Sequence, residues 1–341
     1  MTLPSCFERY RTEVDAELRS SLDAYRSPMY DMLRYHMGWT DQKGNALPGF
    51  AGKALRPTLC LLACEAAGGD YRRSLPAAAA IELIHNFSLI HDDVQDGDRE
   101  RRHRPTVWAI WGKPQAINAG TAMRVVASLT MLRLQERGVP AERLLRAQRL
   151  LDESCLRLIE GQYLDISFEG RLDVGMADYL VMIQGKTASL ISGSLEIGAL
   201  LGSDDEGLIR TLRQFGLNLG LAFQIRDDVL GIWGSEEKTG KPVGNDIWRR
   251  KKSLPIVYAF EKAGGAAGAA LRAIYTGDVI DKGGVDRVLS ILEEVGARDE
   301  AQRIAERYCS RALDELSEAD LSTWAADSMR EMAHFLTERD F

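Results

Sequence analysis

The sequence has few prolines, no paired-cysteine motif and no long uncharged apolar run. Only 10 of its 341 residues are proline, which favours a chain built mainly of helices. The five cysteines are scattered and form no CxxC zinc motif, so we predict reduced thiols and a cytoplasmic location. No stretch reaches the roughly 18 apolar residues of a membrane span, and the first residues lack the apolar core of a signal peptide. We therefore expect no membrane span.

Positive charge is also limited. Lys and Arg number 43 against 50 Asp and Glu, so the formal net charge is -7. This balance argues against a surface that binds nucleic acid in general. The negative net charge still allows a local basic pocket that binds an anion. Each basic cluster must therefore be interpreted from the residues around it.

Helical periodicity is what the sequence does have, along nearly its whole length. Apolar residues recur at helical spacing in segments 55–69, 76–94, 141–166 and 209–234, and no run alternates as a strand would. Glycine and proline clusters separate roughly ten to twelve predicted helices, and none has the composition of a domain linker. We expect an all-α protein, a single large helical bundle in which residues 1–341 form one domain.

Two acidic clusters interrupt these apolar helices. Asp92, Asp93 and Asp96 stand at i, i+1 and i+4, within an arc of about 100° on a helix. Asp227 and Asp228 follow a second apolar run. Like charges this close need a cation, and Mg²⁺ is the hard ion that also binds phosphates. A solvated acidic helix end is an equally good interpretation of the first cluster alone, whereas the pair of clusters favours a diphosphate site.

Basic residues precede two predicted helix starts. Lys53 and Arg56 stand before Pro57, and four arginines at 99, 101, 102 and 104 stand before Pro105. Proline favours the first turn of a helix, whose free amides attract anions, and arginine binds phosphate oxygens as a fork. Lys241 and Lys251 follow the second acidic pair. For either of the first two basic clusters alone, a solvated surface is an equally good interpretation. Nucleic-acid binding is disfavoured, because few aromatic residues lie near the basic residues.

The ordered motifs between Gly52 and Pro255 resemble those of the trans-isoprenyl diphosphate synthases, or polyprenyl synthetases. They are GKALRP, ELIHNFSLIHDDVQD, RRHRPT, GQYLD, KT, FQIRDD and GKP. The resemblance implies an isoprenoid-synthase bundle with a central cavity for diphosphate and magnesium. It implies a short-chain prenyltransferase, similar to geranylgeranyl and farnesyl diphosphate synthases, that condenses isopentenyl diphosphate with an allylic diphosphate by ionisation, condensation and elimination. It also implies a homodimer.

The resemblance also implies residue roles. Several Mg²⁺ ions would be held by Asp92, Asp96 and Asp227, with Asp93 and Asp228 supporting. The allylic diphosphate would meet Arg101, Lys186, Lys241 and Lys251. Isopentenyl diphosphate would meet Lys53, Arg56, His85 and Arg102. Beside Lys186, the catalytic set would include Thr187 and Gln224, whose oxygen dipoles face a developing allylic cation.

Chain length is expected to depend on Phe87 and Ser88. Helix geometry places Phe87 about 140° from Asp92 and Ser88 only about 40° away, so periodicity alone favours Phe87 as a core residue. In related synthases an aromatic at this position resembles a floor beneath the growing prenyl tail. The resemblance then implies a product of about 15 to 20 carbons, with the longer favoured because the first motif lacks a two-residue insertion.

The sequence departs from the family pattern at three positions. Gly231 replaces the third aspartate of the second motif, His103 stands where glycine is common, and Thr121 stands where aspartate is expected. Restoring the pattern with Gly231→Asp is expected to be tolerated. Two rival functions are a class I terpene cyclase, which needs no second diphosphate site, and a non-catalytic subunit of a two-component synthase, which would be expected to lose the first aspartates or the arginines.

Overall fold

The computed structural model describes residues 4–47, 52, 54–234, 243–317, 319 and 321–338. Helices account for nearly all of its regular structure, as the apolar periodicity predicts. The first half contains α1 (Ser5–Leu22), α2 (Pro28–His36), α3 (Leu55–Ala66), η1 (Tyr71–Ser74), α4 (Leu75–Asp96), α5 (Val107–Trp111), α6 (Lys113–Leu132), η2 (Arg133–Gln135) and α7 (Ala141–Phe168).

The second half continues in the same way. It contains α8 (Met176–Ile183), η3 (Gln184–Ala188), α9 (Ser189–Gly202), α10 (Glu206–Trp233), α12 (Asn245–Trp248), α13 (Leu254–Lys262), α14 (Gly265–Thr276), α15 (Lys282–Glu294), α16 (Ala297–Ser317) and α17 (Thr323–Glu338). Among the described residues no helix is long and apolar enough to cross a bilayer.

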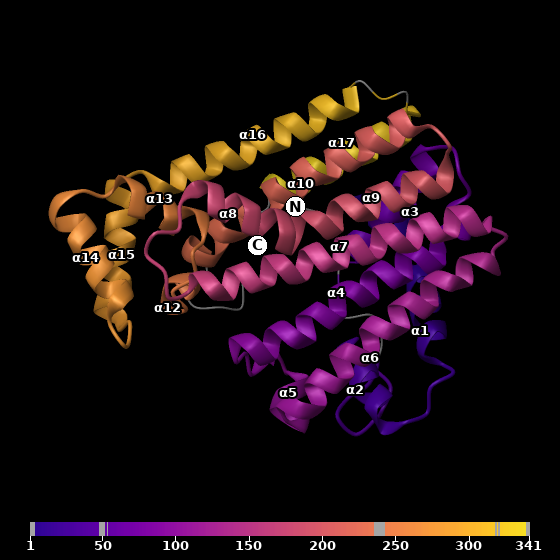
Figure 1. Cartoon of the computed structure of the whole chain (residues 1–341), viewed down its shortest axis with the longest axis horizontal. Coiled ribbons are helices and arrows are strands. Elements are labelled where there is room, and N and C mark those ends of the chain that lie inside the picture. Colours follow the sequence, from indigo (N-terminus) through magenta and orange to yellow (C-terminus); the bar gives the residue numbers. More distant parts are fainter. Residues whose placement is uncertain are drawn as a thin grey trace.

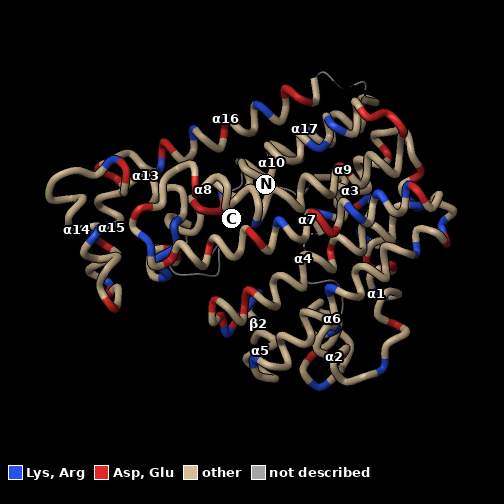
Figure 2. Tube along the Cα trace, viewed as in Figure 1, with Lys and Arg blue, Asp and Glu red and all other residues tan. Residues whose placement is uncertain are grey.

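The long helices lie side by side as a bundle (Figure 1). Helix α4 packs against α6, α3 against α9, and α10 against both α9 and α16, while α14 and α15 project from one end. Figure 2 shows acidic and basic residues together at the C-terminal end of α4 and again near α12. The two acidic helices of the sequence, α4 and α10, therefore belong to one bundle.

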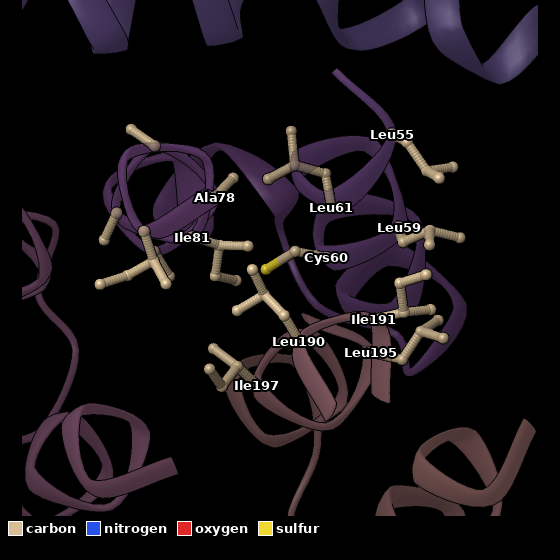
Figure 3. Packing of buried hydrophobic residues seen from close by; sticks show 14 of the residues in the cluster. Leu55, Leu59, Cys60, Leu61, Ala78, Ile81, Leu190, Ile191, Leu195 and Ile197 are labelled. Carbon is tan, nitrogen blue, oxygen red and sulfur yellow. The ribbon is translucent and has the colours of Figure 1, made fainter. Parts of the chain in front are cut away.

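Close backbone approaches hold the centre of the bundle together. In Figure 3, Cys60 of α3, Ile81 of α4 and Leu190 of α9 meet in one apolar cluster. A β-carbon at Gly198 of α9 would overlap the carbonyl oxygen of Cys60, so glycine is what lets these two helices approach. All five cysteines are buried and free of disulfide bonds, whereas the cytoplasmic location remains a prediction.

One small hairpin departs from the purely helical expectation. Strands β1 (Glu100–Arg101) and β2 (Arg104–Pro105) pair antiparallel. The two residues between them, Arg102 and His103, have φ angles of 52° and 59°. Two successive left-handed residues make the tight turn that joins twisted strands, so the hairpin follows from local backbone geometry. His103 adopts this conformation although it is not glycine.

Candidate active site

The first acidic cluster lies at the C-terminal end of α4. Asp92 and Asp96 stand one turn apart, and α4 ends at Asp96 because Gly97 adopts φ 70°. Burial, opposed by the charge of Lys186 and assisted by that of Asp96, raises the pKa of Asp92 to about 6. A half-buried carboxylate pair of this kind calls for a cation.

Asp93 faces a different direction from Asp92. Its side chain is only 2% exposed, and Arg101 of β1 donates a hydrogen bond from Nε to its Oδ1 at 2.8 Å. One residue along a helix is a rotation of about 100°, which takes Asp93 away from the site face. Asp93 therefore holds the hairpin arginine in place.

The two aspartates of the second acidic pair, on α10, also differ in burial and in hydrogen bonding. Asp228 is buried and accepts hydrogen bonds from Tyr179 Oη (2.7 Å), Leu254 N (2.8 Å) and Gln224 Nε2 (2.9 Å). Burial raises its pKa to about 7, with the nearby charge of Asp246 adding to the shift. Asp228 thus joins α8, α10 and α13, whereas Asp227 is only half-buried and is the member of the pair nearer to solvent.

A π-helix carries the next two predicted residues, Lys186 and Thr187. Thr187 donates a hydrogen bond to Gln224 Oε1 at 2.6 Å, which links the π-helix to Asp228 through Gln224. Single-turn π-helices within α-helices frequently mark functional sites, because they rotate side chains out of the regular register. The predicted catalytic trio is therefore brought together on η3 and α10.

Lys186 forms an ion pair with Asp165 of α7. Burial lowers the pKa of Lys186, but the charges of Asp165 and Asp92 outweigh it and the net shift is upward. The approach of α7 and η3 needs Gly161, since a β-carbon there would overlap the backbone nitrogen of Lys186. Sequence reasoning assigned no role to Asp165, although the GQYLD motif contains it.

A separate basic cavity of about 440 Å³ lies beside α3, α4 and the hairpin. Arg56, His85 and Arg102 line it together with the buried carboxyl of Glu82 and the apolar ring of Phe335. Burial holds the pKa of His85 well below its usual value, with the arginines adding to the effect, so its imidazole is neutral. The Nε of Arg56 is buried and finds no hydrogen-bond partner among the described residues. The cavity thus places two guanidinium groups beside a space that an anion could occupy.

Two predicted lysines cannot be placed in this arrangement. Lys53 and Lys241 lie outside the described residues. Lys251 lies across from α4, with its Nζ 3.9 Å from Asp96 Oδ2. The basic residues that are described therefore divide between the acidic face and the separate cavity.

The two predicted chain-length residues lie one helical turn before Asp92. Phe87 is buried in the main core, with its ring edge-on to His91 at 5.6 Å between centroids. Ser88 is also buried and donates a hydrogen bond to the carbonyl of His85 at 2.8 Å. His91 packs closely against Gly120, so Phe87 and His91 together face α6.

Gly231 has a neighbour that the sequence pattern does not reveal. A β-carbon at this position would lie 2.6 Å from the carboxyl carbon of Asp246, which precedes Ile247 in α12. The position of the missing third aspartate is thus already occupied by a carboxylate from another helix.

This contact leads us to expect that Gly231→Asp is less well tolerated than the family pattern suggests. The new side chain would displace Asp246 and place a second negative charge beside it, which is unfavourable at short range. We expect a thermal midpoint several degrees lower, equivalent to about 1–3 kcal/mol. Gly231→Ala, which adds bulk without charge, is the matched control. A midpoint equal to that of the unmodified protein in Gly231→Asp would contradict this interpretation.

The chain is similar to known proteins along most of its length. Residues 39–292 match the family model for polyprenyl synthetase. The chain belongs to the polyprenyl synthetase family. A farnesyl diphosphate synthase of Mycobacterium tuberculosis is 39% identical over 326 residues, 94% of this chain and 89% of that protein. A geranylgeranyl diphosphate synthase of the same organism is 40% identical over 313 residues, 92% of this chain and 88% of that one.

Solved structures agree with the family assignment. The polyprenyl synthetase of Streptomyces coelicolor superposes with a TM-score of 0.88 at 40% identity, covering 97% of this chain and 98% of that one. The geranylgeranyl pyrophosphate synthetase of Pyrococcus horikoshii also gives a TM-score of 0.88, at 34% identity and 98% coverage of both chains. The all-α isoprenoid-synthase fold that the motifs imply is confirmed.

Proposed function

We propose that this polyprenyl synthetase is a short-chain, all-trans prenyl diphosphate synthase. It joins isopentenyl diphosphate to an allylic diphosphate and releases a product of 15 or 20 carbons. The observation that supports the proposal is that one bundle contains two different groups of charged residues, each of which could bind a diphosphate. One is an acidic face with Lys186 and Lys251, and the other is a basic cavity with Arg56 and Arg102. A reaction that joins the carbon chains of two diphosphate substrates needs a binding site for each substrate.

The acidic face fits magnesium. Mg²⁺ in phosphate-binding enzymes is usually held by only one or two carboxylates, with phosphate oxygens and waters completing the octahedron. The proposed carboxylate ligands are Asp92 and Asp96 on α4 and Asp227 on α10, which would give each ion one or two carboxylates. Among the described residues, no group of three or more side chains could hold a metal ion without such additional ligands. Bound there, the ions would supply Lewis-acid stabilisation of the leaving diphosphate.

The chain's own residues would perform the remaining tasks. Lys186 and Lys251 would neutralise the allylic diphosphate, while Arg101, fixed by Asp93, would contact it from the hairpin. The Thr187 hydroxyl and the Gln224 amide oxygen would face the positive charge that develops as the carbon–oxygen bond breaks. Asp165 would keep Lys186 charged and oriented.

The second substrate would bind in the basic cavity. Arg56 and Arg102 would bind its diphosphate, joined by Lys53 from outside the described residues, and the neutral His85 would donate a hydrogen bond. The alkene of isopentenyl diphosphate would then attack the allylic carbon, forming the new carbon–carbon bond. Loss of a proton from the adjacent carbon to the departing diphosphate would restore a double bond, so no enzyme nucleophile is required.

The decisive experiment supplies isopentenyl diphosphate together with dimethylallyl, geranyl or farnesyl diphosphate and sizes the products by chromatography. Linear prenyl diphosphates that form only when isopentenyl diphosphate is present are expected. Cyclic hydrocarbons formed from geranyl or farnesyl diphosphate alone would instead identify a terpene cyclase. Inactivity that only a second polypeptide relieves would identify a non-catalytic subunit.

Phe87→Ala tests the limit on product length. If the buried ring is the floor of the tail pocket, its removal should add five-carbon units to the product while elongation continues. If the ring only fills the core, its truncation should cost about 3–5 kcal/mol of stability and leave product length unchanged. Product size and thermal midpoint, measured together, separate the two roles. An unchanged product would contradict the floor hypothesis.

We also propose that the chain forms a homodimer through α6 and α7. Large apolar side chains stand exposed along one stripe of each helix, among them Val125 (54% exposed) and Leu129 on α6, and Leu156 and Tyr163 (71% exposed) on α7. These two helices are neighbours in the bundle, so the stripes can form one continuous surface for a second copy. Sedimentation equilibrium should give twice the chain mass of 37.9 kDa, and a single-chain mass would contradict the proposal.

The prediction that residues 1–341 form one domain has support in the core. The described residues form three buried apolar clusters. Tyr308 of α16 packs against the first and the second, and Trp233 of α10 packs against the second and the third. Clusters that share residues are expected to unfold together. We therefore propose a single cooperative unit.

A further inference from the structure

Arg249 connects two parts of the active-site rim that are 151 residues apart in the sequence. It follows α12 directly, and its guanidinium lies against the C-terminal end of α4. Nη1 donates a hydrogen bond to Asp98 Oδ2 at 3.2 Å, and Nη2 forms an ion pair with the other oxygen of the same carboxylate. Nη1 also lies 3.7 Å from Asp96 Oδ2. One arginine is thus shared between a metal-site aspartate and a neighbouring carboxylate.

Asp98 is a firmly fixed partner. Its amide donates to the carbonyl of Asp93 at 3.0 Å, and its own carbonyl accepts hydrogen bonds from Thr106 Oγ1 (2.8 Å) and Trp108 Nε1 (2.7 Å). Its side chain is only 12% exposed. Because the backbone of Asp98 is held on both sides, its carboxylate gives Arg249 a defined place beside α4.

The turn that carries Arg249 is equally constrained. The amide of Arg249 donates to Asn245 O at 3.2 Å, and that of Lys251 donates to Asp246 O at 2.9 Å. Lys251 reaches the same Asp96 oxygen at 3.9 Å. The turn therefore presents two cations to Asp96, and of these two Arg249 also forms an ion pair with Asp98.

We propose that Arg249 is a positioning residue whose charge competes with metal at Asp96, and that Asp98 relieves this competition by drawing the guanidinium aside. The proposal rests on the proposed function, in which Asp96 binds magnesium. An ion arriving at Asp96 must displace the nearby guanidinium, and a fixed alternative carboxylate makes that displacement easier. Lys251 is then left available to the diphosphate.

Opposite effects of two substitutions on metal affinity distinguish this role from simple structural support. Arg249→Gln removes the competing cation and should tighten Mn²⁺ binding by about two- to fivefold. Asp98→Asn removes the alternative partner, leaves Arg249 on Asp96 alone, and should weaken Mn²⁺ binding by about the same factor. A residue that merely supported the turn would weaken metal binding when replaced. Arg249→Lys keeps the charge and should stay close to the unmodified protein.

The experiment measures free Mn²⁺ by electron paramagnetic resonance during titration of the full-length protein with Mn²⁺ alone. The double variant Arg249→Gln/Asp98→Asn tests for a general charge effect. In our proposal, the loss of Mn²⁺ affinity caused by Asp98→Asn should largely disappear when Arg249 is also replaced. Arg303→Gln, which breaks an exposed ion pair with Glu300 on α16, is the matched control and should leave binding unchanged.

Each outcome has a defined meaning. Weaker or unchanged Mn²⁺ binding in Arg249→Gln, or strictly additive effects in the double variant, would overturn the proposal while leaving the metal site in place. Absence of saturable Mn²⁺ binding in the unmodified protein, or binding that survives Asp92→Ala, would count against the metal assignment itself. Tighter binding in Arg249→Gln together with a non-additive double variant would support the proposal.

Discussion

Asp92→Asn is expected to lower turnover by roughly 10³-fold without altering the helical circular dichroism. The substitution keeps the shape of the side chain and removes the charge that would hold magnesium. Asp92 forms no hydrogen bond or ion pair with the described residues, and burial already raises its pKa to about 6, so neutralising it should not weaken the fold. Initial rates under saturating substrates and Mg²⁺ provide the measurement.

Two controls sharpen the Asp92 experiment. Asp173→Asn replaces an exposed aspartate paired with Arg171 and should leave the rate unchanged. Asp228→Asn, by contrast, should lower the thermal midpoint, because Asp228 accepts three hydrogen bonds that join α8, α10 and α13. A near-normal rate in Asp92→Asn, or full turnover in excess EDTA, would remove the metal assignment.

Arg102→Gln is expected to raise the Michaelis constant for isopentenyl diphosphate by about 10- to 100-fold, with a much smaller effect on the allylic substrate. Arg102 lines the basic cavity with Arg56 and His85 from the exposed turn of the hairpin, and a guanidinium can bind two phosphate oxygens at once. Losing this contact weakens binding of the one substrate assigned to that cavity. Steady-state kinetics with each substrate varied in turn gives the two constants.

Arg101→Gln is the matched control for this assignment of the basic residues to the two substrates. Arg101 precedes Arg102 in the sequence, but its guanidinium pairs with Asp93, and the sequence motifs assign it to the allylic diphosphate. Its replacement should therefore raise the Michaelis constant of the allylic diphosphate more than that of isopentenyl diphosphate. Equal effects on both substrates in either variant would show that the basic residues are assigned to the wrong sites.

Much of this protein was determined by the sequence alone. The helical class follows from apolar periodicity, because each segment repeats its pattern within a few turns. The family follows from contiguous motifs such as LIHDDVQD and FQIRDD, whose order along the chain needs no structure to be seen. The acidic pairs and the arginines before Pro57 and Pro105 are likewise local patterns.

The tertiary structure decided what each charged residue touches. Asp93 and Asp228 follow Asp92 and Asp227 directly, yet they turn inward to Arg101 and Tyr179, because one residue along a helix rotates the side chain by about 100°. The tight contact between α7 and the π-helix that places Asp165 beside Lys186 could not be read from either segment alone.

The partners of Gly231 and Asp98 were equally invisible to local patterns. Asp246 occupies the space that a side chain at Gly231 would need, and Arg249 reaches Asp98 from 151 residues further along the chain. Such pairings depend on how whole helices pack, and periodicity carries no information about which helix faces which. The sequence determined the chemistry available to this enzyme, whereas packing between distant segments decided which groups remain free to meet the substrates.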